Sequence, residues 1–156
     1  MDVSQIFPKL FVGSYPGSPE DIDRLRQFGI TAVLNVQTDD DVAYCGMNWD
    51  CLESHYQTTG VEVQRVPVRD FDPDDLRRQL PKCVEALDEL LHEGHTVYVH
   101  CNMGINRSPT IVIAYLHWVL GLDLEKATDH VVKCRSCDPY VDVIGLAGED
   151  RNGGGS

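Results

Sequence analysis

A short polar segment, Cys101 to Ser108, combines a nucleophile, a glycine and an arginine in a way that suits phosphate chemistry. Cys101 carries a thiol that attacks phosphorus when ionised, and the planar guanidinium of Arg107 can bind two phosphoryl oxygens at once. Gly104 between them lets the backbone approach a ligand closely. Ser108 is placed to hydrogen-bond the sulfur and to help it leave in a second step. The spacing predicts a phosphoryl-transfer site with Cys101 as nucleophile.

The flanking residues predict the local structure that this chemistry needs. Thr96 to His100 is β-branched and aromatic, which is typical of a short buried strand. Ser108-Pro109 is typical of a helix start. A loop between a strand and a helix points backbone N–H groups inward and adds partial positive charge, which binds phosphate and favours a thiolate. Asn106 is expected at a left-handed position of this loop, because asparagine tolerates that conformation. The predicted phosphate-binding residues are Asn102, Met103, Gly104, Ile105, Asn106 and Arg107.

The string His100-Cys101-x5-Arg107-Ser108 resembles the signature of cysteine-dependent phosphatases, the tyrosine and dual-specificity superfamily. It lies past mid-chain, unlike in the low-molecular-weight tyrosine phosphatases, and the chain is shorter than a receptor-type catalytic domain. Both points favour the compact dual-specificity branch. The resemblance implies a phosphocysteine intermediate and a reaction that needs neither a metal nor a cofactor. His100 is interpreted as a core histidine that fixes the loop by hydrogen bonds.

A second catalytic group is expected in the acidic segment 70–75. Dephosphorylation through cysteine needs a general acid for the leaving oxygen and then a base for the attacking water. Asp70 lies 31 residues before Cys101, directly after the strand expected at Val61–Val68, and this is the placement of the acid in the dual-specificity family. Asp72 is the second choice. The next two aspartates are interpreted as a solvated helix entrance. A pseudophosphatase that only binds phosphate is the non-enzymatic alternative, which the intact Cys101, Arg107 and Asp70 disfavour.

A narrower resemblance covers nearly the whole chain. The stretches that carry it include Phe11-Val12-Gly13-Ser14-x-Pro16, Leu34-Asn35-x-Gln37-x-Asp39, Arg69-Asp70-Phe71-Asp72 and Tyr98-Val99-His100-Cys101. They resemble the laforin-like and plant starch phosphatases, the glucan phosphatases. This resemblance implies a phosphorylated α-glucan as substrate, with Phe71 and Tyr44 lying against the sugar chain, where an aromatic ring offers an apolar face. The alternative for both rings is packing within their loops.

Four positions depart from the glucan phosphatase pattern. Cys45 and Asp138 stand where these enzymes carry aromatic residues, and Met103 and Asn106 stand in place of small residues. These departures do not touch the phosphatase interpretation. They keep a dual-specificity or tyrosine protein phosphatase, acting on phosphoproteins, as the alternative function.

Length and composition limit the number of domains, the partners and the location that can be expected. The chain has 156 residues, so one catalytic domain over 1–150 and a flexible tail over 151–156 are expected. Its net charge is −12, so neither nucleic acid nor an anionic membrane is an expected partner. No apolar run is long enough to cross a bilayer and no signal-peptide pattern is present, which predicts a cytoplasmic protein. Cys134-x-x-Cys137 is interpreted as two ordinary thiols, because no second pair completes a zinc site. Asp39-Asp40-Asp41 is interpreted as a solvated turn.

Strands are expected around 10–12 and at 30–36, 61–68 and 96–100, with Pro67 marking an edge strand or a strand end. Helices are expected after Ser18, at 49–57, up to Gly94 with Pro81 near its start, from Ser108, at 123–133 and, as one or two turns, at 138–146. Because strands alternate with helices, the predicted fold class is α/β, with a mixed, largely parallel central sheet flanked by helices as in the dual-specificity phosphatases.

Overall fold

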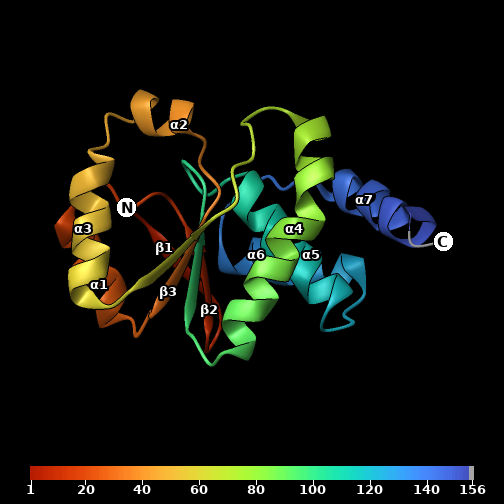
Figure 1. Ribbon diagram of the computed structural model, residues 1–156. Coiled ribbons are helices and arrows are strands. Elements are labelled where there is room, and N and C mark those ends of the chain that lie inside the picture. Colours follow the sequence, from red (N-terminus) through yellow and green to blue (C-terminus); the bar gives the residue numbers. More distant parts are fainter. Residues whose placement is uncertain (155–156) are drawn as a thin grey trace.

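A five-stranded sheet forms the centre of the molecule, and helices cover both of its faces (Figure 1). The computed structural model describes residues 1–154. In spatial order the strands are β1 (Val3–Phe7), β2 (Leu10–Gly13), β5 (Val97–His100), β3 (Ala32–Asn35) and β4 (Glu62–Arg65). β1 pairs with β2 in antiparallel fashion, and the other neighbouring strands are parallel. The predicted fold class is therefore confirmed.

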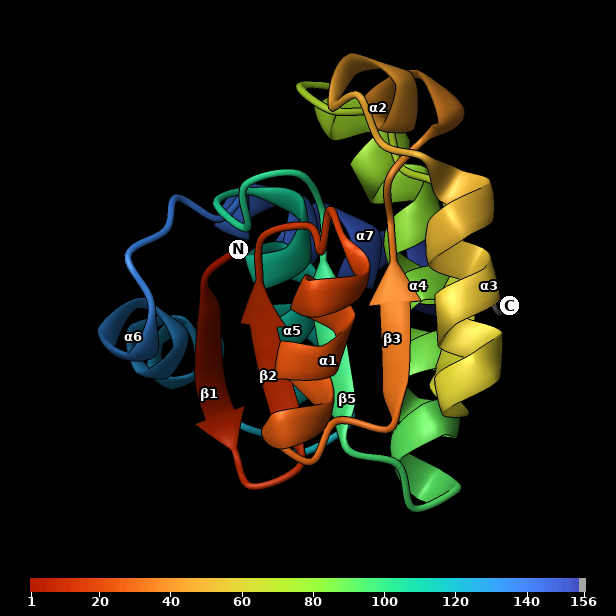
Figure 2. The same ribbon diagram turned by 90° about the vertical axis from the view of Figure 1, so that its left-hand side faces the viewer.

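The helices divide between the two faces of the sheet. α1 (Pro19–Gln27) and α3 (Trp49–Thr59) lie on one face (Figures 1 and 2). The other face is covered by α4 (Pro73–His92), α5 (Arg107–Trp118), α6 (Leu124–Cys134) and α7 (Val141–Gly154). The short helix α2 (Asp39–Tyr44) lies beyond the end of the sheet toward which β2 and β3 point (Figure 2).

The strand sequences account for the two cores. Successive side chains of a strand point to opposite faces, so a strand covered on both sides is apolar throughout. On β5, Val97 and Val99 are buried in the larger core with residues of α4 and α5, whereas Tyr98 is buried in the smaller core with residues of α1 and α3. All residues of β2, β3 and β5 are buried. The central strands are therefore held firmly from both sides.

Several elements differ from the sequence predictions. β1 was not predicted as a separate strand, since Val3–Phe7 is short and largely half-exposed. α4 begins at Pro73 and not near Pro81, which lies inside the helix. The Asp72 side chain accepts a hydrogen bond from the Asp75 N–H at 3.0 Å, and Pro73 occupies the first turn. Both features are typical of a helix start, so the helix begins at Pro73, before the expected start near Pro81. β4 is shorter than predicted but lies at the edge of the sheet, as Pro67 indicated.

The last helix, α7, runs further along the chain than the one or two turns predicted at 138–146. Residues 151–154 continue α7, while 155–156 lie outside the described residues, so the tail expected over 151–156 stays a prediction. Arg77 on α4 binds both carboxylate oxygens of Asp150 at 2.7 and 2.8 Å. The Arg151 guanidinium lies 4.3 Å from the ring centroid of Trp118. These contacts hold α7 against α4 and α5 and extend it beyond the one or two turns that were predicted.

The sheet register brings three loops to one edge. His100, the last residue of β5, is paired with Gly13 at the end of β2 and with Asn35 at the end of β3. The segments that follow these three parallel strands therefore leave the sheet side by side. The segment after β5 is the predicted phosphate loop, which begins at Cys101. The segment after β2 leads to α1, and the segment after β3 leads to α2.

Candidate active site

The predicted phosphate loop links β5 to α5. Cys101 directly follows the strand and is almost fully buried, and α5 begins at Arg107. The Asn106 side chain donates a hydrogen bond to the Asp138 carbonyl at 2.8 Å. Asn106 has φ −113°, so the predicted left-handed conformation is wrong for this residue. The left-handed position in the loop is Gly104, with φ +70°.

Gly104 is required by packing behind the loop. A Cβ at this position would lie 2.5 Å from the Gly13 carbonyl carbon and 2.6 Å from an Arg135 nitrogen. Arg135 donates from Nε to the Gly104 carbonyl at 2.7 Å and from Nη2 to the Met103 carbonyl at 2.9 Å. These bonds provide partners for two carbonyl groups of the loop. Gly104 is thus required by the approach of neighbouring protein groups. Its predicted contact with phosphate stays a prediction.

Cys101 lies in a cavity of about 240 Å³. Its lining residues are Asp70, Phe71, Cys101, Asn102, Met103, Ile105, Asn106 and Arg107. The structure therefore brings together the predicted nucleophile, the preferred general acid and every predicted phosphate-binding residue except Gly104. Ser108 Oγ lies 3.3 Å from Cys101 Sγ, within hydrogen-bonding reach of the sulfur, as its spacing predicted.

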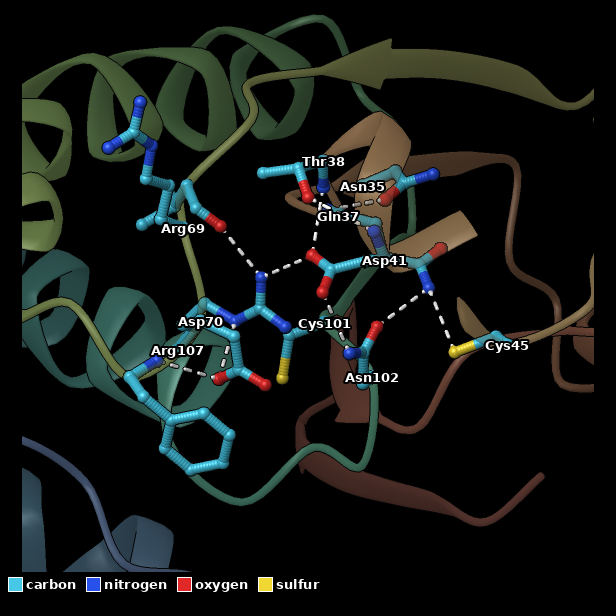
Figure 3. A network of polar contacts seen from close by, with 12 residues as sticks. Asn35, Gln37, Thr38, Asp41, Cys45, Arg69, Asp70, Cys101, Asn102 and Arg107 are labelled. Atoms are coloured by element: carbon cyan, nitrogen blue, oxygen red, sulfur yellow. Dashed lines mark hydrogen bonds and ion pairs between the residues drawn. The ribbon is translucent and has the colours of Figure 1, made fainter. Parts of the chain in front are cut away.

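Arg107 is 1% exposed and is held from one side (Figure 3). Its Nη1 donates to Asp41 Oδ2 and to the Val68 carbonyl, both at 2.7 Å. Its Nε lies 3.4 Å from Asp70 Oδ1, an ion-pair distance without hydrogen-bond geometry. Among the described residues, Nε and Nη2 have no hydrogen-bond partner. These two N–H groups form one planar edge of the guanidinium, which is the edge that binds an oxyanion in bidentate fashion.

Asp41 is a site residue, and its interpretation as part of a solvated turn is wrong. It is buried at the start of α2, where Thr38 and Asp41 form a capping box with bonds of 2.9 and 3.1 Å. Its Oδ1 accepts a hydrogen bond from Asn102 at 3.0 Å, in addition to the bond from Arg107 to Oδ2. The charge was expected to be solvated because it lies in a run of three aspartates, but the helix start turns this one inward.

The electrostatics of Asp41 follow from these contacts. Burial acts to raise the pKa of Asp41, but hydrogen bonds from Arg107, the Thr38 N–H and Asn102, together with the Arg107 charge, lower it below its ordinary value of 3.8. Asp41 is therefore an anion that orients Arg107. Asn102 is fixed in turn, because its Oδ1 accepts a bond from Gln37 Nε2 at 2.8 Å.

The two candidate acids have different surroundings. Asp70 lines the cavity, and its Oδ1 accepts a hydrogen bond from the Phe71 N–H at 3.1 Å. Asp72 points its carboxylate at the Asp75 N–H as the N-cap of α4. A carboxyl group that caps a helix is held away from a reacting phosphate, so the geometry favours Asp70.

The two predicted sugar-binding aromatics are both at the surface. Phe71 is 79% exposed and Tyr44 is 89% exposed, so the alternative that they pack within their loops does not fit. Phe71 lines the cavity, whereas Tyr44 lies on α2 outside its lining. Phe71 has φ +56° and is the one non-glycine residue in the described chain with positive φ. Phe71 directly follows Asp70, and both residues line the same cavity.

His100 is fully buried beneath the loop. Its Nδ1 donates to the Cys101 carbonyl at 3.0 Å, because a carbonyl only accepts. Burial lowers the pKa of His100 to about 4, an effect to which Arg107 and Arg65 add and which the bond to Cys101 opposes. A neutral imidazole therefore fixes the start of the loop, as predicted. A possible set of metal ligands, Glu62, Glu93 and His95, lies within 4.8 Å of one another, but it belongs to the opposite end of the sheet.

Comparison with known proteins identifies the family. The dual specificity phosphatase catalytic domain matches residues 10–140. The chain belongs to this family. It is 36% identical over 147 residues to "Phosphoglucan phosphatase DSP4, amyloplastic" of Castanea sativa, covering 93% of the chain and 39% of the relative. It is 34% identical over 158 residues to "Laforin" of Mus musculus, covering 94% of the chain and 48% of the relative. The chain thus spans less than half the length of these relatives.

Solved structures agree with this dual specificity phosphatase fold. PTPMT1 superposes with a TM-score of 0.77 at 23% identity, covering 99% of both chains. Human DUSP28 superposes with a TM-score of 0.71 at 25% identity, covering 99% of this chain and 95% of that one. The family confirms the expected class of a cysteine-dependent phosphatase. Within residues 1–154 no helix has the length and apolarity needed to span a membrane. The expected cytoplasmic location stays a prediction, since the plant relative is named amyloplastic.

Two site residues of this dual specificity phosphatase domain were missed by sequence reasoning. Asp41 has one sequence signal, the Thr38-x-x-Asp41 spacing of a capping box, which marks a helix start. Arg135 has none, because its contacts to the phosphate loop depend on where α6 ends in space.

Proposed function

We propose that this chain is a phosphoglucan phosphatase that works through a phosphocysteine intermediate. The observation that carries the chemistry is the arrangement of Arg107. Its buried Nε and Nη2, without a hydrogen-bond partner in the described chain, share one cavity with Cys101 and Asp70. A phosphate monoester dianion bound to that edge would pair with both N–H groups and lie within reach of the Cys101 sulfur.

The reaction proceeds in two steps. The Cys101 thiolate attacks phosphorus in line with the leaving oxygen, and protonated Asp70 gives its proton to that oxygen as the P–O bond breaks. The phosphocysteine is held by the loop N–H groups and Arg107. Asp70, now a carboxylate, takes a proton from a water molecule that attacks phosphorus. The S–P bond breaks, inorganic phosphate leaves, and Ser108 Oγ–H stabilises the departing thiolate across the 3.3 Å contact.

The substrate class rests on two further observations. Relatives at 34–37% identity over more than nine-tenths of the chain are named phosphoglucan phosphatases and laforin. Phe71, at the rim of the cavity, and Tyr44, on α2, are exposed aromatic rings. Aromatic rings at the surface match the apolar face of a pyranose, and packing against the core does not account for their position.

A protein phosphatase is the second candidate. Dual specificity protein phosphatases 9 and 1 of Homo sapiens are 32% and 34% identical over 133 residues. Their matches cover 85% of this chain, against 93–94% for the glucan-acting relatives. The matches to the glucan-acting relatives are longer, which favours the glucan proposal.

The deciding experiment compares phosphate release from phosphorylated amylopectin and from a phosphotyrosine peptide at equal phosphate concentration. We expect higher kcat/KM on amylopectin, with the Cys101→Ser variant inactive on both substrates as the control for contaminating phosphatases. Brisk release from the peptide with no detectable release from amylopectin would assign the chain to the protein phosphatases instead.

A further inference from the structure

A second cavity opens beside the phosphate site, at the connection between β2 and α1. Its volume is about 580 Å³, and its lining includes Asp2, Ser14, Tyr15, Ser18, Asp21 and Met103. Met103 is 61% exposed and also lines the cavity that holds Cys101. The two cavities therefore share one wall. A polymer that places a phosphate at Cys101 can continue over Met103 into the second cavity.

Tyr15 is fixed relative to the phosphate loop. Its N–H donates to the Asn102 carbonyl at 2.9 Å, which ties the β2–α1 connection to the loop. Gly17 leaves room for the ring, since a Cβ there would lie 3.0 Å from it, and the Gly17 N–H donates to Asp21 Oδ2 at 2.9 Å. Tyr15 thus presents a half-exposed ring at a set distance from the reacting phosphate, and such pre-organisation lowers the cost of binding.

The charges in this cavity differ from those at the phosphate site. The lining of this cavity includes Met1, two carboxylate residues, Asp2 and Asp21, and two hydroxyl residues, Ser14 and Ser18, but neither lysine nor arginine. Ser14 Oγ accepts a hydrogen bond from the Asp2 N–H at 2.9 Å and Ser18 Oγ accepts one from the Asp21 N–H at 3.2 Å, and a hydroxyl oxygen can accept a second bond. Arg135 pairs with Asp2 at 2.6 Å, which leaves the Asp21 charge without an ion pair in the described chain. Carboxylate and hydroxyl oxygens accept hydrogen bonds from sugar hydroxyls. The same negative groups disfavour a second phosphate or an acidic peptide side chain.

We propose that this cavity is a sugar subsite, which binds unphosphorylated glucose units of the same α-glucan chain whose phosphorylated unit lies at Cys101. Tyr15 lies against the face of one pyranose, and the surrounding oxygens accept its hydroxyl protons. The inference rests on the proposed function and deepens it: the enzyme recognises a neutral stretch of glucan on one side of an isolated phosphate. An apolar ring with a few polar groups around it is the usual composition of a small-molecule site.

The test compares kcat/KM on phosphorylated amylopectin with kcat/KM on p-nitrophenyl phosphate, which is too small to reach the second cavity. Tyr15→Ala should lower the ratio of glucan to aryl phosphate activity about tenfold, on the scale of one lost apolar face. Tyr15→Phe keeps the face and should retain the wild-type ratio. Unphosphorylated maltoheptaose should inhibit the wild type on amylopectin and inhibit Tyr15→Ala more weakly. Phe28→Ala removes an exposed aromatic at the other end of α1 and is the matched control.

The outcomes separate the subsite from the proposed function. If the wild type releases no phosphate from amylopectin, the proposed function fails and the subsite fails with it. If the wild type is active on amylopectin but Tyr15→Ala keeps the wild-type ratio, only the subsite is overturned. An equal loss on both substrates makes Tyr15 a support of the phosphate loop. A selective loss on a phosphopeptide with basic flanking residues makes the cavity a peptide site instead.

Discussion

Arg107 Nη1 and Asp41 Oδ2 lie 2.7 Å apart, with side chains that are 2% and 11% exposed. Asp41 and the Val68 carbonyl together take up Nη1 and direct the opposite edge of the guanidinium toward the cavity. Removal of one partner from a buried ion pair leaves an uncompensated charge. Asp41→Ala should therefore cost about 3–5 kcal/mol of unfolding free energy, measured by urea denaturation. It should also lower kcat/KM on p-nitrophenyl phosphate about 10- to 100-fold through misplacement of Arg107.

Asp40→Ala is the matched control, because Asp40 is the exposed neighbour in the same turn of α2. It should cost about 0.3–1 kcal/mol through the helix dipole alone. The stability difference between wild type and Asp41→Ala should also depend on pH. Since the pKa of Asp41 is lowered in the folded state, its contribution is present above about pH 4 and is lost as the pH falls through the lowered value. Equal costs for the two variants would contradict the structural role of Asp41.

Substitution of Cys101 or Arg107 tests the nucleophile and the phosphate fork. Cys101→Ser should abolish turnover of p-nitrophenyl phosphate, while inorganic phosphate still protects the variant against thermal unfolding. Arg107→Lys should also be inactive, because a point charge cannot replace two coplanar N–H donors. Steady-state kinetics and thermal unfolding with and without phosphate provide the measurements. A Cys101→Ser variant with activity within tenfold of wild type would exclude Cys101 as the nucleophile.

The roles of Asp70 and Asp72 can be distinguished by how the activity of their variants depends on the leaving group of the substrate. Asp70→Asn should lower the rate about 10²–10⁴-fold on an alkyl phosphate, whose poor leaving group needs a proton. The loss should be smaller on p-nitrophenyl phosphate, because nitrophenolate leaves without one. Asp72→Asn keeps an oxygen that caps α4, so it should change stability little and leave the rates on both substrates close to those of the wild type. If Asp72→Asn shows the leaving-group pattern and Asp70→Asn does not, Asp72 is the acid.

The sequence was sufficient for the parts of the site that are local. Cys101, Ser108 and Arg107 lie within one strand–loop–helix segment, so their spacing alone determines their relative positions. Asp41 contacts Arg107 across 66 residues. That contact depends on the packing of α2 over the end of the sheet, which neither composition nor periodicity encodes. The left-handed position was assigned to Asn106 because asparagine tolerates that conformation. The constraint that instead requires Gly104 there comes from Gly13 and Arg135, which are distant in sequence.

For the fold, too, local features could be predicted from the sequence, whereas features that depend on distant contacts could not. The central strands are apolar on both faces and are bounded by turns, so their presence and their largely parallel pairing were predicted from the sequence. The order of the strands in the sheet was not. The start of α4 was misplaced because proline usually marks a first turn, whereas Pro81 is tolerated within the helix. A stripe of buried residues, including Leu76, Leu80 and Leu87, holds the helix on both sides of it. Tertiary packing decides such positions.

Buried His100 predicts a loss of stability in mild acid. Its pKa is about 4 in the folded protein against an ordinary value of 6.5, so between these values the unfolded chain binds a proton that the folded one does not. Stability should therefore fall as the pH decreases from 6.5 to 4, by about 3 kcal/mol for this group. His100→Asn keeps a donor near the Cys101 carbonyl but does not titrate, and it should flatten this part of the curve. His92→Asn, at an exposed site, should leave the slope unchanged.

Phe71 provides the test of substrate recognition at the cavity rim. Its ring is 79% exposed beside the proposed acid, so a glucan chain that places a phosphate at Cys101 has to pass it. Phe71→Ala should lower kcat/KM on phosphorylated amylopectin about 5- to 150-fold, equivalent to about 1–3 kcal/mol of lost apolar contact. The loss on p-nitrophenyl phosphate should be much smaller, because that substrate needs only the loop, Arg107 and Asp70. Phe71→Leu keeps apolar bulk without an aromatic face and should be intermediate. A parallel loss on both substrates would mean that Phe71 acts by holding the Asp70 loop, through the positive φ of its backbone, and not by binding sugar.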